Sequence, residues 1–387
     1  MKDASCLNRQ VRQMIYADNA ATTELDIDAF EAMKPYLMKQ YGNASQAYLF
    51  AKPAKKALSE AREIIAACIG ARPEEIYFTS GGTESDNWAV KSILFMSKDR
   101  QRVVTSQIEH HAILNACNSL EKLGIPVDYL PVDSRGVLQS NILQDRICKD
   151  EDTGLVSIML ANNEIGTIEP IKDLCEIAHA KGALFHTDAV QAVGHIPINV
   201  KSLGVDMLSA SAHKFNGMKG SGFLYVRNGV NIHSFLDGGA QEHEKRAGTE
   251  NVAAIVAMAV ALKKNCDKML SSSEKLKRIE NLFIRTLTNG NVDYIRNGAT
   301  NHLPGNVNIS IHGVDGELLL HRLDLKGICI STGSACDSVN TQVSHVVKAI
   351  KVPAAYSKGT IRITFGTNNT EAEAVEIAQS LIQILEK

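Results

Sequence analysis

The sequence predicts an α/β fold, with a mainly parallel β-sheet covered by helices on both faces and a second, smaller α/β unit. Short β-branched runs alternate with amphipathic helical stretches from about residue 58 to residue 226, which is typical of such a sheet. A long helical pattern over residues 253–287 then leads to further strand patterns. The chain has 387 residues, more than one hydrophobic core usually organises, so two domains are expected.

The large sheet is predicted from strands that each lead into a helix. The predicted strands cover residues 76–79, 102–105, 155–160 and 183–186, and the predicted helices cover residues 83–96, 112–123 and 171–180. Ligands of such folds bind where the carboxyl ends of the strands meet the following loops. We therefore expect the functional residues in those loops.

The smaller unit is predicted from the rest of the chain. Its predicted strands cover residues 305–310, 327–331 and 360–364, and a closing helix covers residues 372–385. We expect a large domain over residues 16–262 and a small domain made of residues 1–15 and 263–387. The sequence contains no internal repeat or low-complexity linker, so the domains should pack together with a cleft between them.

The composition is that of an ordinary globular protein, with 44% hydrophobic and 22% charged residues. A formal net charge of −2 gives no reason to expect nucleic acid or an anionic membrane as a partner. Residues 1–6 lack the apolar core of a signal peptide, and no apolar run is long enough to span a bilayer. We expect a cytoplasmic protein.

The eight cysteines are scattered and form no CxxC pair, so neither a zinc knuckle nor a disulfide framework is indicated. Several lie in helical patterns, such as Cys175 within residues 174–178, and read as small buried hydrophobic residues. Cys336 differs, because glycine, serine and aspartate surround it. It is the candidate reactive thiol.

Lys214 is the candidate nucleophilic amine. It follows the apolar run 205–208, lies beside Ser211 and His213, and precedes a glycine-rich turn at residues 215–222. A lysine at a strand end can be partly desolvated, which lowers its pKa and frees the amine to form a Schiff base. The alternative is a solvated surface charge, the commonest role of lysine.

Asp188 ends a predicted apolar strand, where a carboxylate is costly unless a cation pairs with it. A protonated pyridine nitrogen is one such cation, and an arginine or lysine elsewhere in the chain is the alternative. Lys214, Asp188 and Cys336 together would supply an amine for an aldehyde cofactor, an acid for its ring nitrogen and a thiol for the substrate.

Two segments are candidates for binding a phosphate. Residues 80–85 (SGGTES) lie between a strand and a helix, where glycines let backbone N–H groups approach an anion. The lysine of a nucleotide P-loop is missing, so a nucleoside triphosphate is not indicated. Residues 238–249 are a second segment rich in glycine, with an arginine and a threonine. The alternatives are helix caps for the first segment and a solvated loop for the second.

Other polar residues also follow predicted strands. His110 could stack on a cofactor ring or transfer a proton, whereas we expect His111 to face solvent at a helix start. Asn163 could reach a cofactor oxygen or satisfy turn backbone. Arg362 alternates with apolar neighbours in a strand and could bind a substrate carboxylate or form a structural ion pair. No metal is expected, since these histidines lack a ligand spacing such as HExxH.

Several strings of the sequence resemble the cysteine desulfurases of the NifS/IscS type, which are class-V aminotransferases and fold type I pyridoxal-phosphate enzymes. The resemblance runs from residues 16–23 (YADNAATT) to about Gly366. The strings that carry it are FTSGGTES at residues 78–85, NNEIG at 162–166, DAVQ at 188–191, HK at 213–214 and GSAC at 333–336. It implies a large domain with a mainly parallel seven-stranded sheet and a small domain that carries the loop with Cys336.

The resemblance also implies roles for individual residues. Lys214 would hold the aldehyde of pyridoxal 5′-phosphate, Asp188 would pair with its ring nitrogen, and His110 would stack on the ring. Gln191 and Asn163 would meet the phenolic oxygen or the substrate, and Arg362 would bind the substrate carboxylate. The phosphate would be held by Gly82, Thr83, Ser211, His213 and, across a homodimer interface, Thr249 of a second subunit.

The reaction implied is conversion of L-cysteine to L-alanine, with Lys214 or His110 moving the Cα proton and Cys336 receiving sulfur as a persulfide. A sulfur-acceptor protein of iron–sulfur cluster assembly or tRNA thiolation would then take the sulfur. Tyr48, Met218 and Val343 depart from the family pattern, and Asp337 should oppose thiolate formation at Cys336. The alternatives are selenocysteine lyase activity, another fold type I aminotransferase or lyase, and a non-catalytic paralogue.

Overall fold

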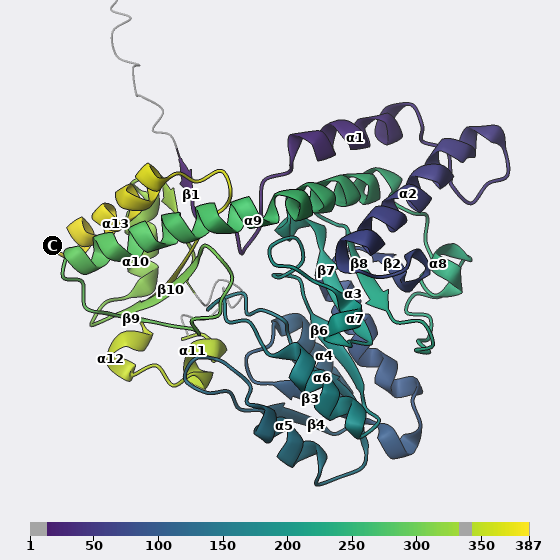
Figure 1. The fold of residues 1–387 in the computed structure, drawn as a ribbon, viewed down its shortest axis with the longest axis horizontal. Helices are drawn as coiled ribbons and strands as arrows, with labels where there is room; N and C mark the ends of the chain where they lie inside the picture. The colour runs from purple at the N-terminus through teal and green to yellow at the C-terminus, as the bar shows by residue number, and fades with distance from the viewer. Residues whose placement is uncertain (1–13, 333–342, 387) are drawn as a thin grey trace, which may run out of the picture.

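A computed structural model describes residues 14–332 and 343–386 (Figure 1). Its largest sheet has seven strands in the order β2-β8-β7-β6-β5-β3-β4. Strand β8 runs antiparallel to β2 and β7, and the remaining neighbours are parallel, which confirms the predicted mainly parallel sheet. The strands are β2 Ile76–Thr79, β3 Arg102–Ser106, β4 Val127–Leu130, β5 Thr153–Ser157, β6 Leu184–Asp188, β7 Met207–Ser211 and β8 Gly222–Val226.

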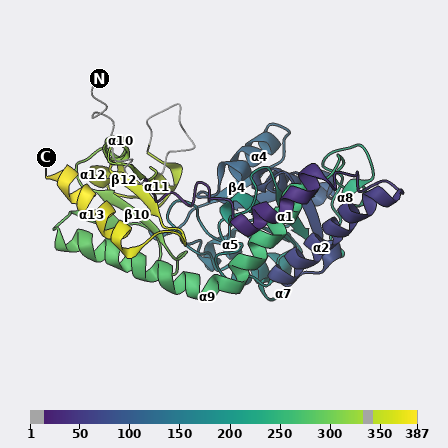
Figure 2. The same ribbon diagram turned by 90° about the horizontal axis from the view of Figure 1, so that it is seen from above.

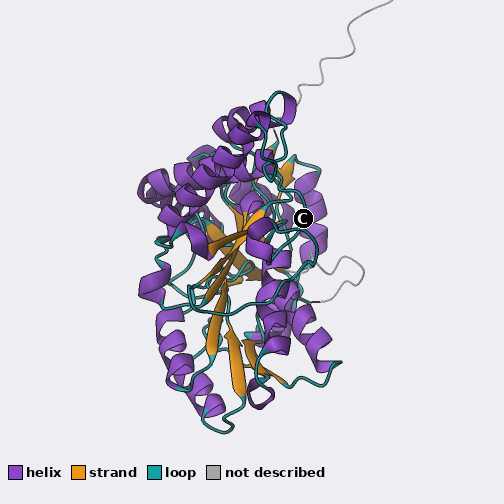
Figure 3. Cartoon of the chain, turned by 90° about the vertical axis from the view of Figure 1, so that its right-hand side faces the viewer, coloured by secondary structure: helices purple, strands orange, loops and turns teal. Residues whose placement is uncertain are grey.

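Helices cover both faces of this sheet (Figure 3). Because side chains alternate across a strand, Val103 and Leu155 join one apolar cluster, while their neighbours Val104 and Val156 join the other. The helices of this part of the chain are α1 Ile27–Met38, α2 Lys52–Ile69, α3 Gly82–Lys91, α4 His111–Glu121, α5 Ser140–Ile147, α6 Ile171–Ala180, α7 Val200–Leu203 and α8 Gln241–Glu244. Because these helices cover the faces of the sheet, a site can form at its edge, where the parallel strands have their carboxyl ends.

The smaller unit has a three-stranded antiparallel sheet in the order β12-β10-β9 and a parallel pair of short strands, β1 and β11. An apolar cluster of its own lies against this sheet. The elements are β1 Ile15–Tyr16, β9 Tyr294–Arg296, β10 Asn306–Ile311, α10 Gly316–Asp324, β11 Ile328–Cys329, α11 His345–Ala349, α12 Ala354–Ser357, β12 Thr360–Thr364 and α13 Glu371–Leu385.

Helix α9 (Val252–Asn289) has 38 residues and runs along both units (Figures 1 and 2). Its first turns, from Ala253 to Leu262, belong to the apolar cluster of the large sheet, whereas Leu276 to Leu287 belong to that of the small unit. We propose that the two domains divide near residues 262 and 263, inside this helix, as the sequence predicts. The two separate clusters support that division.

Several predicted elements differ from those observed, and the strand expected over residues 327–331 is only β11, Ile328–Cys329. The strand expected over residues 155–160 ends at Ser157, although Ile158 and Leu160 still donate backbone hydrogen bonds to β6. The helix expected over residues 83–96 is α-helical only to Lys91 and continues as a 3₁₀ helix, Ser92–Phe95. Across the described residues, every helix is too short or too polar to cross a membrane.

Candidate active site

A cavity of about 310 Å³ lies at the carboxyl ends of the strands of the large sheet, where the sequence predicts a site. Ten of the residues singled out from the sequence line it together. They are Gly82, Thr83, His110, Asn163, Asp188, Gln191, Ser211, His213, Lys214 and Arg362. The volume is in the range of small-molecule sites.

Lys214 closes one wall of the cavity. It ends the 3₁₀ turn that follows β7, and its Nζ donates to the carbonyl oxygens of Ala20 at 2.6 Å and Ala21 at 2.8 Å. The side-chain amide of Gln191 also donates to Ala20, at 2.9 Å. The segment after β1, which comes from the small unit, therefore orients the two polar groups of this wall.

Asp188 is the last residue of β6 and is 4% exposed. Its Oδ1 accepts a hydrogen bond from the backbone N–H of Val190 at 2.9 Å. Burial raises the pKa of Asp188 to about 6, although that hydrogen bond and the charge of Lys214 oppose the rise. The site therefore holds a carboxyl group whose ionised form lacks full compensation from this chain.

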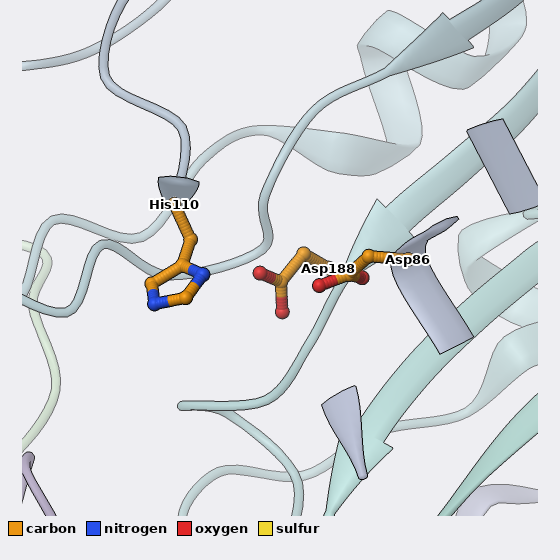
Figure 4. A group of neighbouring side chains, drawn as sticks. All are labelled: Asp86, His110 and Asp188. Atoms are coloured by element: carbon orange, nitrogen blue, oxygen red, sulfur yellow. The ribbon is translucent and has the colours of Figure 1, made fainter. Parts of the chain in front are cut away.

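His110 lies across from Asp188 (Figure 4). Its Nδ1 accepts the backbone N–H of Ala112 at 3.1 Å and caps α4, so a neutral ring carries its proton on Nε2. Burial, and after it the charge of Lys214, lowers the pKa of His110 to about 4. The imidazole is therefore neutral near pH 7, as a ring that stacks on an aromatic group requires.

Another part of the cavity is built around the start of α3. A side chain at Gly82 would place its Cβ 2.5 Å from Cγ2 of Val190, so the chain can approach so closely only with glycine there. Burial lowers the pKa of His213 to about 4, and its Nδ1 lies 3.1 Å from the hydroxyl of Thr22. Backbone N–H groups at a helix start, with hydroxyl and imidazole groups, can bind an anion.

The second glycine-rich segment, residues 238–249, reaches the same part of the cavity through one ion pair. Arg246 Nε lies 2.8 Å from a carboxylate oxygen of Glu84, in the first turn of α3. Thr249 itself is exposed, and it is not among the residues that line the cavity. Thr249 would therefore make the expected phosphate contact in the cavity of a second subunit.

Arg362, on β12 of the small unit, reaches into the cavity from the other side. Its Nη2 lies 2.7 Å from Oδ1 of Asp18, and its Nη1 donates to the carbonyl oxygen of Asn163 at 3.0 Å. Among the described residues, its buried Nε has no hydrogen-bond partner. Of the two interpretations of Arg362, the structural ion pair is therefore observed, and one donor is left over for a ligand.

His111 corrects one prediction. The ring was expected to face solvent, but it lines the cavity, and its centroid lies 4.9 Å from that of His345. His345 Nε2 lies 3.0 Å from the carbonyl oxygen of Glu109. Tertiary packing of α11 against the start of α4 therefore brings together two histidines that a helical pattern alone assigns to the surface. Cys336 lies outside the described residues.

Asp86 is the functional candidate that the sequence analysis missed. It lies on α3, is 1% exposed and lines the cavity. One of its oxygens, one oxygen of Asp188 and one ring nitrogen of His110 lie within 4.8 Å of one another. The signal in the sequence was an aspartate one turn inside the helix that follows the glycines, but that pattern alone predicts a solvated position.

Comparison with known proteins identifies the family. The family model described as aminotransferase class-V matches residues 15–377. A cysteine desulfurase IscS of Dictyoglomus turgidum is 48% identical over 379 residues, which cover 97% of this chain and 96% of that relative. The chain belongs to the cysteine desulfurases of the class-V aminotransferase family. The resemblance found in the sequence is thereby confirmed.

Solved structures agree with this cysteine desulfurase fold. A structure named NifS-like protein has a TM-score of 0.90 and 36% identity, covering 96% of this chain and 99% of the other. A structure of SspA in complex with cysteine has a TM-score of 0.82 and 33% identity, covering 92% of this chain and 100% of the other. The predicted fold class, a fold type I enzyme with a mainly parallel seven-stranded sheet, is confirmed.

Proposed function

We propose that this cysteine desulfurase uses pyridoxal 5′-phosphate to convert L-cysteine to L-alanine and passes the sulfur atom to Cys336 as a persulfide. The observation that carries the proposal is the cavity in which the Lys214 amine and the buried Asp188 carboxyl group lie with a neutral His110. A binding site for an aldehyde with a basic ring nitrogen needs these three groups.

Pyridoxal phosphate fits the residues of the cavity. Asp188, buried with a raised pKa, would gain the cation it lacks from the protonated ring nitrogen, and His110 would cover a ring face. Lys214 would hold the aldehyde carbon. The cradle at Gly82 would take the phosphate together with Thr83, Ser211 and His213. When bound, the cofactor withdraws electrons from the substrate Cα so that its proton can leave.

The residues of the chain would bind the substrate and move its proton. Arg362 Nε, a buried donor without a partner in the described part of the chain, is available to the substrate carboxylate, and Asn163 lines the same wall. The amine of Lys214 or the Nε2 of His110 would carry the Cα proton. In the neutral His110 ring, Nδ1 accepts the Ala112 N–H and Nε2 already holds a proton. Nε2 can therefore donate that proton, but it can accept the Cα proton only as it passes its own proton to a second group.

Sulfur transfer would be completed by the thiolate of Cys336. Its Sγ would attack the sulfur of the substrate, an S–S bond would form, and the C–S bond would break with its electron pair moving to the substrate carbon, which takes up a proton. The products are alanine and a persulfide on Cys336. We propose that a sulfur-acceptor protein of iron–sulfur cluster assembly or tRNA thiolation removes that sulfur, in the cytoplasm.

A homodimer would complete the phosphate site through Thr249 of a second subunit. Large apolar side chains gather in exposed positions on α1 and the segment that follows it, which is typical of a surface that a partner covers. They are Ile27, Leu37, Met38, Tyr41, Tyr48 and Leu49. Tyr48, which departs from the family pattern, would then be an interface residue.

The test uses the purified full-length protein supplied with pyridoxal phosphate. We expect a yellow protein whose visible band disappears on borohydride treatment, with the label on the peptide that contains Lys214 and with alanine formed from L-cysteine. Lys214→Ala is the matched control and should form no label. A protein that takes up no pyridoxal phosphate, or that yields an oxo acid in place of alanine, would contradict the proposal.

A second variant separates sulfur transfer from selenocysteine lyase activity. In Cys336→Ala, release of sulfur from L-cysteine should collapse, while release of selenium from L-selenocysteine need not depend on that thiol. Undiminished sulfide production by Cys336→Ala would overturn the assignment of Cys336.

A further inference from the structure

Asp188 has a second carboxyl group close behind it. Asp86 projects from α3, and Figure 4 shows Asp188 between His110 and Asp86. One polar atom of each of the three side chains lies within 4.8 Å of the other two. Two carboxylate charges this close in a buried place repel each other strongly, so one of the pair must hold a proton.

The neighbours of Asp86 offer it no cation. His186 Nε2 lies 3.8 Å from Oδ1 of Asp86, but its ring nitrogens lie 2.9 Å from the hydroxyls of Ser157 and Ser209. Burial lowers the pKa of His186 to about 3, so that ring is neutral. Within the part of the chain that the structure describes, Oδ1 of Asp86 has no hydrogen-bond partner, and a hydrogen bond with Ser209 opposes protonation of Asp86.

The neighbours of Asp188 are different. Asp188 accepts the backbone N–H of Val190 at 2.9 Å, and the charge of Lys214 favours its ionised form. Burial raises the pKa of Asp86 well above its usual range, and the charges of Asp188 and Glu109 raise it further. Glu109 is itself buried with a raised pKa. The proton of the pair therefore belongs on Asp86, and the negative charge belongs on Asp188.

We propose that Asp86 is a positioning residue that remains a neutral carboxylic acid behind Asp188 and so keeps the negative charge on the carboxylate facing the cofactor. The inference rests on the proposed function, because it assigns to Asp188 the ring nitrogen of pyridoxal phosphate. A neutral acid fills the space beside Asp188 and can turn its O–H toward that carboxylate, whereas an ionised one would repel it.

The substitution that tests this inference is Asp86→Asn, because asparagine has the shape and the donor of a protonated aspartate but cannot ionise. Asp86→Ala removes the donor and leaves a void. Lys91→Ala, on the same helix and not among the residues lining the cavity, is the matched control. The probe is pyridoxal phosphate added to each full-length apoprotein, with its dissociation constant and the pH midpoint of the visible band as readouts.

We expect Asp86→Asn to bind the cofactor within about threefold of the wild type, and Asp86→Ala to bind it about tenfold more weakly or worse. The pH midpoint of the visible band should be unchanged in Asp86→Asn and shifted in Asp86→Ala. A purely structural role of Asp86 would not cause such a shift. Thermal unfolding of each apoprotein shows whether a variant has folded.

Two results would overturn the inference while leaving the proposed function intact. One is a folded Asp86→Asn protein that binds as weakly as Asp86→Ala, which would mean that the charge of Asp86 is needed. The other is an Asp86→Ala protein that binds with the affinity and pH midpoint of the wild type. Failure of the wild-type protein to bind the cofactor would instead overturn the proposed function, and the inference with it.

Discussion

Buried acids occur in both units of this cysteine desulfurase, but their surroundings are opposite. In the small unit, Glu280 of α9 pairs with Arg296, lies 2.8 Å from His302 and accepts the backbone N–H of Gly305 at 3.0 Å. Burial opposes its ionisation, yet the bonds from His302 and Arg296 outweigh burial and hold the pKa of Glu280 below its usual range. At the large sheet, burial dominates and raises the pKa of Asp188.

The difference indicates different roles for Glu280 and Asp188. Glu280 finds its cations within the chain, so it strengthens the native fold. For Asp188, Asp86 and Glu109 burial outweighs the favourable contacts and raises the pKa, so these acids weaken the apoprotein at the pH at which they would ionise. A buried acid whose cation the chain does not supply indicates that a ligand brings one.

The largest effect is expected from Asp188→Ala. Without the carboxylate, the ring nitrogen of pyridoxal phosphate would lose its proposed partner, and kcat/KM for L-cysteine should fall about a thousandfold to ten-thousandfold. Alanine formation by the variant, saturated with pyridoxal phosphate, measures the loss. Glu280→Gln is the contrasting variant, and its folded fraction should keep most of the activity. A modest loss in Asp188→Ala would mean that Asp188 is not the partner of the cofactor.

Glu280→Ala should lower the stability of the fold and leave the catalytic reaction largely unchanged. Removing it leaves Arg296 partly buried without its acid, and breaking such a pair costs about 3–5 kcal/mol of unfolding free energy. Denaturant unfolding of the apoprotein provides the measurement. The surface pair Lys263–Asp267 offers a control, because solvent screens this exposed ion pair and Asp267→Ala should leave the unfolding free energy nearly unchanged. Equal losses in the two variants would mean that the buried ion pair of Glu280 adds no more to stability than a surface pair.

Asp188→Asn should stabilise the apoprotein above neutral pH. The folded pKa of Asp188 is about 6 and the unfolded value about 4, so its contribution to stability is lost as pH rises between them. The isosteric amide removes that loss, and its gain should reach about 2–3 kcal/mol at pH 8 and vanish near pH 4. Urea unfolding at the two pH values tests this, and a variant less stable than the wild type at pH 8 would contradict it.

The smallest effect is expected at His302. The hydrogen bond to Glu280 raises the pKa of His302, so this pair stabilises the fold fully below the unfolded pKa of histidine and less as pH rises through the folded one. Glu280, whose pKa is lowered, must also be ionised, so the pair stabilises the fold most between about pH 4.5 and 6.5. His302→Gln should cost about 1 kcal/mol or less at pH 6 and nothing near pH 9. A loss of stability that does not change with pH would show that protonation of His302 is not coupled to folding.

Much of the fold follows from local patterns in the sequence. Helix α6 and strand β12 have the predicted bounds, because an amphipathic period and an alternating period leave few other choices. The cluster of residues at the site was also predictable, since parallel strands bring their carboxyl ends to one edge of the sheet. Asn162, the neighbour of Asn163, satisfies the turn that it begins by accepting the N–H groups of Glu164 and Ile165.

The contacts that were missed depend on packing between distant segments. Asp18 and Arg362 lie 344 positions apart and meet only because strand β1 and strand β12 belong to one unit. His111 meets His345 only after α11 packs against the start of α4. Asp86 is polar in a helix, which favours solvent by pattern, but the adjacent strands β6 and β7 bury it. No local signal distinguishes such a position from a solvated one.

The route of the chain through the cavity sets the order in which the protein can mature. The Lys214 amine is held by carbonyl groups near residue 20, and Arg362 comes from the last strand to be synthesised. A ribosome must therefore release almost all of the polypeptide before the pocket gains the arginine proposed to bind the substrate carboxylate. Substrate binding belongs after translation, and a nascent chain stalled within α9 should form no alanine from L-cysteine.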